Sequence, residues 1–478
     1  MADSQEQNTQ GLDITQDLDI TQGVDITQGV DIATAPLRDL AGSNTVAVAA
    51  PAEVPPTAHP GVATLERTTD PIFIFSYLAN LTIVTVNAAT FVFADWVAWL
   101  AAHGSTGAAY HEELPGRIIQ YGIFAAISVR IFLGQSIDHF GVRRVWLFMS
   151  TLTFFGLAIF ASLTELSPML YLGRTLFAVG LSGMFTCGTF HIQSCVVEHR
   201  RTEFIALLGS SGFVGMILGP QLSGMLRWLC NDSVEVFFPR LFQGTVVLIA
   251  AYIVFVLMAT RGLPRPGRHP ARPSLIRLTR DYWPGMVMFV AMAMGIVFTV
   301  PSLYLVRFNQ HEDFGGIAAY WTTYALMAFA FRLRTAALSR RVGRFRLIFV
   351  GLLFQGLGLW ALIPVSEWWH LLFSASLCGF GHALLFPSIV SLGSGSFPAR
   401  YRGSGTNLTL GCLDLGIGLS APLLGKIIDL PAFDGAGFRQ MFFVAGSVPL
   451  SVAAIWFLAK RHQIDNETRA PSTIETAA

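Results

Sequence analysis

The chain has 478 residues, and its composition is that of a protein folded in a lipid bilayer. Hydrophobic residues make up 53% of the chain, aromatic residues 12% and charged residues only 13%, whereas soluble domains contain about 25% charged residues. This composition excludes an ordinary soluble fold. The formal net charge of +1 gives no reason to expect a nucleic-acid partner. The five cysteines show neither a disulfide framework nor metal-ligand spacing, so no metal and no cofactor is expected.

Residues 1–70 differ from the rest of the chain. They carry eleven acidic and two basic side chains and contain the near-perfect hexapeptide repeats GLDITQ, DLDITQ, GVDITQ and GVDIAT, followed by a stretch rich in Ala, Pro and Thr. Large apolar residues are too few to offset the entropy of ordering, and the start lacks the basic and apolar regions of a signal peptide. We therefore expect a disordered acidic tail on the cytoplasmic side. A regulatory or partner-binding role is the alternative to a simple solvated tail.

The remainder contains twelve apolar stretches of about 19 to 29 residues, each long enough to cross a bilayer as a helix. The expected spans are 72–97, 115–137, 145–163, 169–195, 204–229, 241–260, 283–306, 317–338, 346–364, 368–396, 405–429 and 439–460. We thus predict an all-α integral membrane fold of two six-helix bundles. The expected domains are an N-terminal bundle at 71–260, a cytoplasmic linker at 261–282, a C-terminal bundle at 283–460 and a cytoplasmic tail at 461–478.

The two predicted bundles are related by an internal repeat. A shift of 202 residues places similar residues at equivalent helix ends, in the same order in both halves. The matched positions are Arg130 and Arg332, Gly141 and Gly343, Arg144 and Arg346, Arg200 and Arg402, Gly209 and Gly411, and Pro220 and Pro422. Parallel repeats of this kind are typical of transporters that bind their solute between two halves.

Arginines predict the orientation of the spans. Sixteen lie in or next to the five even-numbered connections, whereas the six odd-numbered connections hold only Arg240 and Arg307, with Arg117, Arg227 and Arg439 just inside the adjoining spans. Because cytoplasmic loops are enriched in Lys and Arg, both termini and the linker are expected in the cytoplasm. This indicates a multi-pass protein of the cell membrane, the plasma or inner membrane, and we expect a monomer in the lipid bilayer.

The loop between the second and third spans reads RIFLGQSIDHFGVRRV. It resembles the signature motif of the major facilitator superfamily, and this resemblance implies a transporter fold with a gating role for the loop. The residues at the family positions are Gly134, Asp138, Gly141, Arg143 and Arg144. Gly134 would allow a close helix approach, Gly141 a tight turn, and Asp138 would accept charged hydrogen bonds or cap the turn locally. The corresponding loop of the second half has Arg340 where the acid stands.

Two further spans resemble family patterns. The fifth span is similar to the antiporter pattern of the superfamily, although plain helix packing and a bend at the proline explain the same residues. Its pattern residues are Gly215, Gly219, Pro220 and Gly224. In the fourth span, Arg174 occupies a position that the resemblance implicates in proton coupling; the alternative is an arginine that extends to the membrane surface. From Arg130 to Leu430 the chain most resembles the branch of arabinose and multidrug efflux permeases.

Asp414 in the eleventh span would be costly alone inside a bilayer. Arg130 in the second span lies at a similar depth, and the superfamily fold places these two spans together. We expect an Arg130–Asp414 pair that closes the cytoplasmic side and opens when Asp414 takes up a proton or solute binds. A permanent structural ion pair is the alternative.

Other polar residues are candidates for lining the central cavity. Asn80 and Asn87 are seven residues apart and therefore share a helix face. Together with Asp95 they are expected to line the cavity; the alternative is that the asparagines form hydrogen bonds to neighbouring helices. His382 lies near the expected membrane midplane. Either it takes part in proton coupling, because a histidine can titrate between pH 5 and 8, or it is a packed, hydrogen-bonded core residue. The 38 phenylalanines favour an apolar or amphipathic solute over a strongly anionic one.

The sequence therefore predicts a secondary active transporter that exports a small solute by proton antiport with alternating access. An uptake symporter or facilitative permease is the first alternative, and a non-transporting membrane sensor or scaffold is the second. We do not expect an enzyme, because the sequence has no HExxH metal motif, phosphate-binding loop or nucleophile elbow. The expected partners are the small-molecule solute and protons.

Overall fold

The computed structural model describes Leu65 and residues 67–103, 110–196, 200–263, 273–398, 401–433 and 436–469. Most of the predicted tail 1–70, the middle of the linker and the last nine residues therefore lie outside the described residues. Within the described residues, the regular secondary structure is helical.

The first half contains six helical segments. The first is interrupted: α1 (Pro71–Ala89) is followed by a 3₁₀ turn (Thr90–Val92) and then by α2 (Phe93–His103). The chain continues through α3 (Glu113–Phe140), α4 (Val142–Ser162), α5 (Met169–Cys195), α6 (Arg201–Leu229) and α7 (Val234–Ala259). Asp70 caps the start of α1, where its carboxylate accepts a hydrogen bond of 2.9 Å from the Ile72 amide.

The second half repeats this arrangement after a short helix, α8 (Leu275–Asp281), within the linker. Its first segment is also interrupted, because α9 (Val287–Thr299) passes through a π turn (Val300–Tyr304) into α10 (Leu305–Glu312). Pro301 lies in this turn and removes a backbone donor there. The remaining elements are α11 (Ile317–Val342), α12 (Arg344–Trp360), α13 (His370–Gly395), α14 (Arg402–Ile428), a 3₁₀ turn (Pro431–Phe433) and α15 (Phe438–Arg469).

Ten of these helical segments are long and apolar enough to cross a membrane. The other two expected spans are present as helices but differ in composition or length: α11 carries four arginines in its second half, and α12 has 17 residues. At the C-terminal end, α15 continues to Arg469, beyond the expected end of the span at 460. The sequence did not predict α8.

Equivalent turns confirm the repeat. Gly141 between α3 and α4 has φ of +84°, and Gly343 between α11 and α12 has φ of +88°. These are backbone conformations that glycine adopts without strain. The helix neighbours agree as well, since α4 packs against α5 and α7 in the first half, as α12 packs against α13 and α15 in the second.

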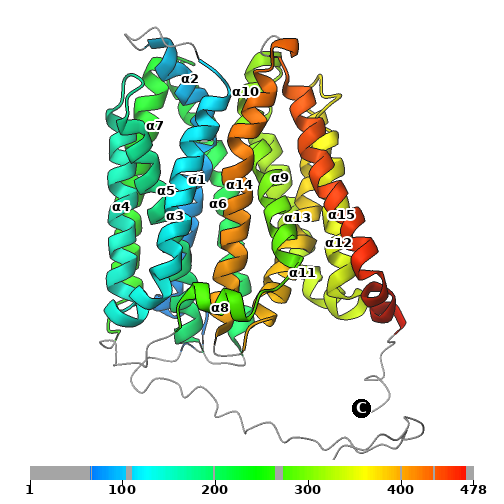
Figure 1. Ribbon diagram of the computed structural model, residues 1–478. Coiled ribbons are helices and arrows are strands. Elements are labelled where there is room, and N and C mark those ends of the chain that lie inside the picture. Colours follow the sequence, from blue (N-terminus) through cyan, green and yellow to red (C-terminus); the bar gives the residue numbers. More distant parts are fainter. Residues whose placement is uncertain are drawn as a thin grey trace, which may run out of the picture. The chain divides into compact units, whose positions relative to one another are not determined.

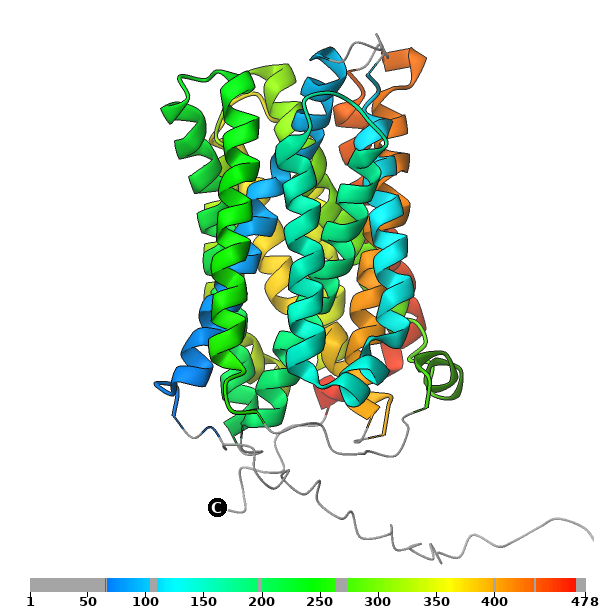
Figure 2. The same ribbon diagram turned by 90° about the vertical axis from the view of Figure 1, so that its left-hand side faces the viewer.

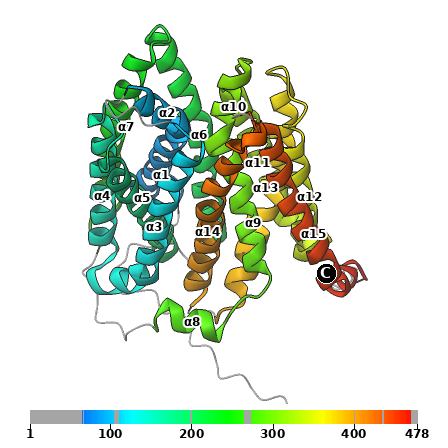
Figure 3. The ribbon, with the colours of Figure 1, turned by 45° about the horizontal axis from the view of Figure 1, so that its top comes forward.

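The two halves meet along two pairs of helices, α3 with α14 and α6 with α11 (Figure 1). The helices run between two ends of the body, and α8 lies at one of them (Figure 2). We call this end, with α8 and the Gly141 and Gly343 turns, the linker end. The opposite end, with Glu112 and Asp429, is called the far end and comes forward in Figure 3.

Large apolar side chains remain exposed on the outer helices, as expected for surfaces in contact with lipid. Examples are Phe132, Phe148, Val247, Phe373 and Leu458. Buried aromatic residues form the interior of each bundle. Some of their polar atoms are hydrogen-bonded there: Trp146 Nε1 donates to the Tyr252 hydroxyl at 2.6 Å, and Trp456 Nε1 to the Phe345 carbonyl at 3.0 Å.

Candidate functional site

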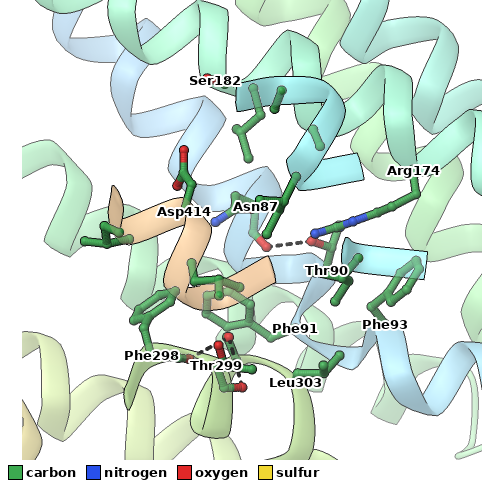
Figure 4. Close-up of a pocket in the computed structure, with 18 of the residues that line it drawn as sticks. Asn87, Thr90, Phe91, Phe93, Arg174, Ser182, Phe298, Thr299, Leu303 and Asp414 are labelled. Carbon is green, nitrogen blue, oxygen red and sulfur yellow. Dashed lines mark hydrogen bonds between the residues drawn. The ribbon is translucent and has the colours of Figure 1, made fainter. Parts of the chain in front are cut away.

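A cavity of about 240 Å³ lies between the two halves (Figure 4). The first half contributes residues from α1, the following turn, α2, α3 and α5, and the second half contributes residues from α9, the π turn and α14. Its wall combines aromatic side chains such as Phe91, Phe185 and Phe298 with the polar side chains of Asn87 and Ser182. A largely apolar cavity with a few polar groups is the usual form of a small-molecule site.

Arg130 and Asp414 lie in contact in the wall of this cavity. Arg130 Nη2 is 2.5 Å from Asp414 Oδ2, and only 7% of the arginine side chain is exposed. A third residue, Asn407, accepts from Arg130 Nη1 at 3.0 Å and donates back to the Arg130 carbonyl at 3.3 Å. The cluster joins α3 to α14 and hence one half of the molecule to the other.

The sequence did not single out Asn407. It precedes Asp414 by seven residues on α14, so both side chains lie on the same helix face. Asn407 could have been found in the sequence from this seven-residue spacing, because a polar residue on the same face as Asp414 is expected to lie near Arg130.

Arg174 also lines the cavity but is held differently. Its guanidinium carbon lies 5.0 Å from the centre of the Phe93 ring and 5.2 Å from that of Phe177. The Nε atom is buried without a hydrogen-bond partner, and no ion pair among the described residues includes Arg174. The side chain points into the space beside Thr90 (Figure 4). Arg174 thus contributes a cationic side chain to the cavity wall.

Of the other predicted lining residues, Asn87 contributes to the cavity wall and the rest do not. Asn80 instead bonds to α6, where its amide donates to the Ser211 hydroxyl at 2.7 Å and to the Leu208 carbonyl at 3.1 Å. This is the helix-bonding alternative for that asparagine. His382 contacts the Tyr324 hydroxyl, with 2.6 Å between Nδ1 and the oxygen, inside the second half.

Asp95 belongs to a second polar cluster, at the far end. Arg307 on α10 donates to Glu112 Oε1 from Nε at 3.0 Å and from Nη2 at 2.8 Å, and its Nη1 lies 3.5 Å from Asp95 Oδ1. Burial beside Glu112 raises the pKa of the Tyr110 phenol, so Tyr110 remains a donor to Glu112 Oε2, at 2.9 Å. These contacts again join the two halves.

Asp429 adds to these contacts at the end of α14. Its two carboxylate oxygens accept from the backbone amides of Glu112 and Glu113, at 3.0 and 2.9 Å. The carboxylate thereby caps the N-terminus of α3, which carries a partial positive charge. Sequence reasoning did not identify Glu112, Arg307 and Asp429 as site residues. The feature that could have indicated them is Arg307, the single arginine of its odd-numbered connection, together with acidic residues at the ends of neighbouring helices.

The glycines of α6 pack against α1. A Cβ atom at Gly215 would lie 2.8 Å from Val84 Cβ, and one at Gly219 would lie 2.6 Å from Ala88 Cβ. Pro220 lies inside the helix, whereas nothing lies within 4 Å of such an atom at Gly224. Close packing thus accounts for Gly215 and Gly219.

The signature loop follows the expected turn with one exception. Gly141 adopts the positive φ that the tight turn requires, and Arg143 and Arg144 are exposed at the start of α4. Asp138 is half-buried on the last turn of α3. No neighbouring described element lies within 4 Å of the place where a Cβ atom of Gly134 would be, so the close helix approach expected at this glycine is not present in this structure.

Two six-helix halves around a central cavity, with lipid-exposed outer surfaces, define a multi-pass membrane protein of the transporter class. The family model of the Major Facilitator Superfamily matches residues 78–421 and 322–476. The chain belongs to this superfamily, and it is a transporter of that family.

Relatives and solved structures agree with this assignment. An MFS-type transporter of Escherichia coli, YhhS, is 22% identical over 75% of this chain and 86% of its own length. An MFS-type transporter of Pseudomonas aeruginosa is 34% identical, but over 26% of this chain and 30% of its own length. The efflux pump roqT of Penicillium rubens is 31% identical over 29% of this chain and 24% of its own. The crystal structure of the peptide transporter POT in complex with sulfate aligns with 85% of this chain and with 98% of the POT chain, at a TM-score of 0.68 and 15% sequence identity.

Proposed function

We propose that the protein is a proton-coupled transporter that exports a small apolar or amphipathic solute by antiport. The observation that carries this proposal is the Arg130–Asp414 pair, which lies in the cavity wall and spans the two halves. A carboxylate in this position is within reach of a bound solute and also controls a contact between the halves.

The proposed cycle depends on the charge of Asp414. When ionised, the carboxylate holds Arg130 and keeps α3 against α14. A proton on Asp414 removes the charge, weakens this contact and lets the halves rock around the cavity. Arg130 remains bonded to Asn407, which limits the cost of releasing its partner inside the membrane.

The far-end cluster would act as the opposing closure. Arg307, Glu112 and Asp429 join the two halves there in this structure, so the cavity would open to the far end only after these contacts break. With the arginine-rich connections in the cytoplasm, the far end faces outward and the protein lies in the inner membrane as a monomer, with both termini inside.

Export is supported by two features. The glycine and proline positions of α6 resemble the antiporter pattern, and the Penicillium relative is an efflux pump by name. The second candidate is proton-coupled uptake. It is supported by the charge of the cavity wall, in which Arg130 and Arg174 face a single acid, Asp414, among the lining residues.

The test is proton movement in liposomes that contain the purified full-length protein and an internal pH-sensitive dye. A panel of small solutes is loaded inside at equal internal and external pH, and the external solution is then diluted. Antiport moves protons inward as solute leaves, whereas symport moves them outward with the solute. Asp414→Asn is expected to abolish either signal while solute flux continues, with Arg117→Gln, an exposed arginine, as the control. Solute-coupled proton movement that survives Asp414→Asn would refute the role of Asp414.

A further inference from the structure

The cavity wall is not electrically balanced. Three of its lining residues carry full charges, namely Arg130, Arg174 and Asp414. Asp414 and Arg130 neutralise each other through their 2.5 Å contact. The charge of Arg174 therefore remains without a counter-charge in a cavity that lies within the membrane-spanning helices.

An uncompensated guanidinium is costly in such a place. Arginines inside membrane proteins pair with acids or with backbone carbonyls, and leaving a buried charge without a partner costs several kcal/mol. The side chains labelled beside the Arg174 guanidinium in Figure 4 are those of Asn87 and Thr90, neither of which is an acid. The Thr90 hydroxyl donates to the Asn87 carbonyl at 2.7 Å, and its oxygen carries no formal charge to balance the guanidinium.

The surroundings of Arg174 hold the guanidinium in place without satisfying it. The Phe93 and Phe177 rings lie 5.0 and 5.2 Å from its central carbon, close enough for cation–π attraction. These rings supply no hydrogen-bond acceptor for the Nε–H group, which is left over. Arg174 is thus a positioned cation whose guanidinium end reaches into the cavity (Figure 4), where its Nη groups, rather than the buried Nε–H, are the donors that face a bound anion.

The rest of the cavity accommodates an apolar body. Phe91, Phe298 and Leu303 also line it (Figure 4). The volume of about 240 Å³ is below the roughly 300–1,000 Å³ of sites for drug-sized ligands. This combination fits a small molecule with an anionic group at one end and an apolar group at the other.

We propose that Arg174 is the anion subsite of the cavity and that the transported solute is a small amphipathic monocarboxylate. Its carboxylate accepts hydrogen bonds from the Arg174 guanidinium, and its apolar part lies against Phe91 and Phe298. This inference rests on the proposed transport function and specifies its substrate class.

The charge of the cavity also fixes the sign of coupling to protons. Protonation of Asp414 leaves Arg130 without its counter-charge, which raises the net charge of the lining from +1 to +2. A carboxylate then binds more tightly, so proton and solute favour each other's binding. Joint binding of proton and carboxylate is the behaviour of the second candidate function, proton-coupled uptake, whereas antiport requires proton and solute to compete; the direction of proton movement in the liposome assay distinguishes the two.

The test compares three probes that share a 2-phenylethyl group and differ in their polar end, with the purified full-length protein in detergent: 3-phenylpropionate, its amide and 3-phenylpropylamine. Binding is measured by isothermal titration and by ligand-dependent thermal stabilisation. The carboxylate is expected to bind at least tenfold more tightly than the amide and the amine. Arg174→Gln should remove this preference, Arg174→Lys should retain part of it, and Asp414→Asn should tighten carboxylate binding severalfold.

The matched control is Arg332→Gln. Arg332 also packs between two phenylalanine rings, at 5.6 Å from Phe213 and 5.3 Å from Phe386, but it does not line the cavity. Its substitution should leave the carboxylate preference unchanged. Equal binding of the three probes, a preference for the amine, a preference that survives Arg174→Gln, or unchanged carboxylate binding in Asp414→Asn would each overturn the proposal.

The carboxylate-binding test of the Arg174 subsite and the liposome test of proton-coupled transport can give negative results independently of each other. Carboxylate binding that depends on Arg174, without solute-coupled proton movement in liposomes, would retain the subsite and refute the proposed proton-coupled transport. Flux of neutral or cationic solutes with no preference for carboxylates would retain transport and refute the subsite.

Discussion

The two interfaces between the halves have equivalent arginines in different chemical settings. Arg130 on α3 packs beside Gly411 of α14, and Arg332 on α11 packs beside Gly209 of α6. Asp414 follows Gly411 by three residues, whereas the residue at the equivalent distance from Gly209 is Gly212. Arg130 therefore has an acid to pair with, and Arg332 instead packs between two phenylalanine rings.

The same asymmetry continues toward the far end. Asp429 of α14 caps the start of α3 through two backbone hydrogen bonds. Between α6 and α11, a side-chain hydrogen bond of 3.0 Å joins Gln221 to Thr322. A duplicated backbone thus carries charged contacts on one side and mainly packing on the other. A response to protons is accordingly expected at the α3–α14 interface.

The largest expected effect is that of Arg130→Leu. It leaves Asp414 buried without its counter-charge, which should lower stability by about 3 kcal/mol and remove proton coupling. Arg332→Leu should cost clearly less, because no acid loses its partner. Thermal unfolding of both variants in detergent measures the difference. The double variant Arg130→Leu/Asp414→Leu should recover stability without recovering coupling, and equal losses in Arg130→Leu and Arg332→Leu would show that the two interfaces are equivalent.

The second effect concerns the far end. Asp429→Ala removes the cap of α3 and should cost about 2 kcal/mol, because hydrogen bonds to charged groups contribute about 1.5–3 kcal/mol. The far end should then open more often. An added cysteine at Ser302, in the cavity wall, should react severalfold faster with a maleimide that does not cross membranes, applied from the far side. Unchanged labelling would exclude Asp429 from the closure.

A third change is designed to make the interfaces alike. Gly212→Asp places a carboxylate at the position equivalent to Asp414. A Cβ atom there would meet Val84 at 3.9 Å and Asn80 at 4.0 Å, which are ordinary contact distances. Pairing with Arg332 should raise stability by about 1 kcal/mol and slow transport, because both interfaces would then be held by charges. Reduced stability together with unchanged transport would show that Arg332 does not reach this position.

The smallest effect is expected for Gln221→Ala. The hydrogen bond to Thr322 is exposed, so its loss should cost about 0.5 kcal/mol and leave proton coupling intact. Thermal unfolding and the liposome assay check both statements. A loss of coupling in this variant would place part of the proton response at the α6–α11 interface.

Much of the fold followed from the sequence alone. The length and apolarity of the spans predicted the helices, because a bilayer forces the backbone to satisfy its hydrogen bonds internally. The 202-residue repeat predicted two equivalent halves, and Gly141 and Gly343 confirmed it by adopting the same turn. These features are local or periodic, and periodic features are readable from one chain.

The composition of the site depended on the tertiary structure. Asn407 and Arg307 meet partners 277 and 195 residues away in the chain, and no spacing rule reaches across the two halves. The structure also separated residues that the sequence grouped together: Asn87 lines the cavity, whereas Asn80 bonds to α6 and Asp95 to Arg307. Which charge is balanced and which is left over depends on side chains brought together by packing, and for this reason the unpaired Arg174 emerged only from the folded arrangement.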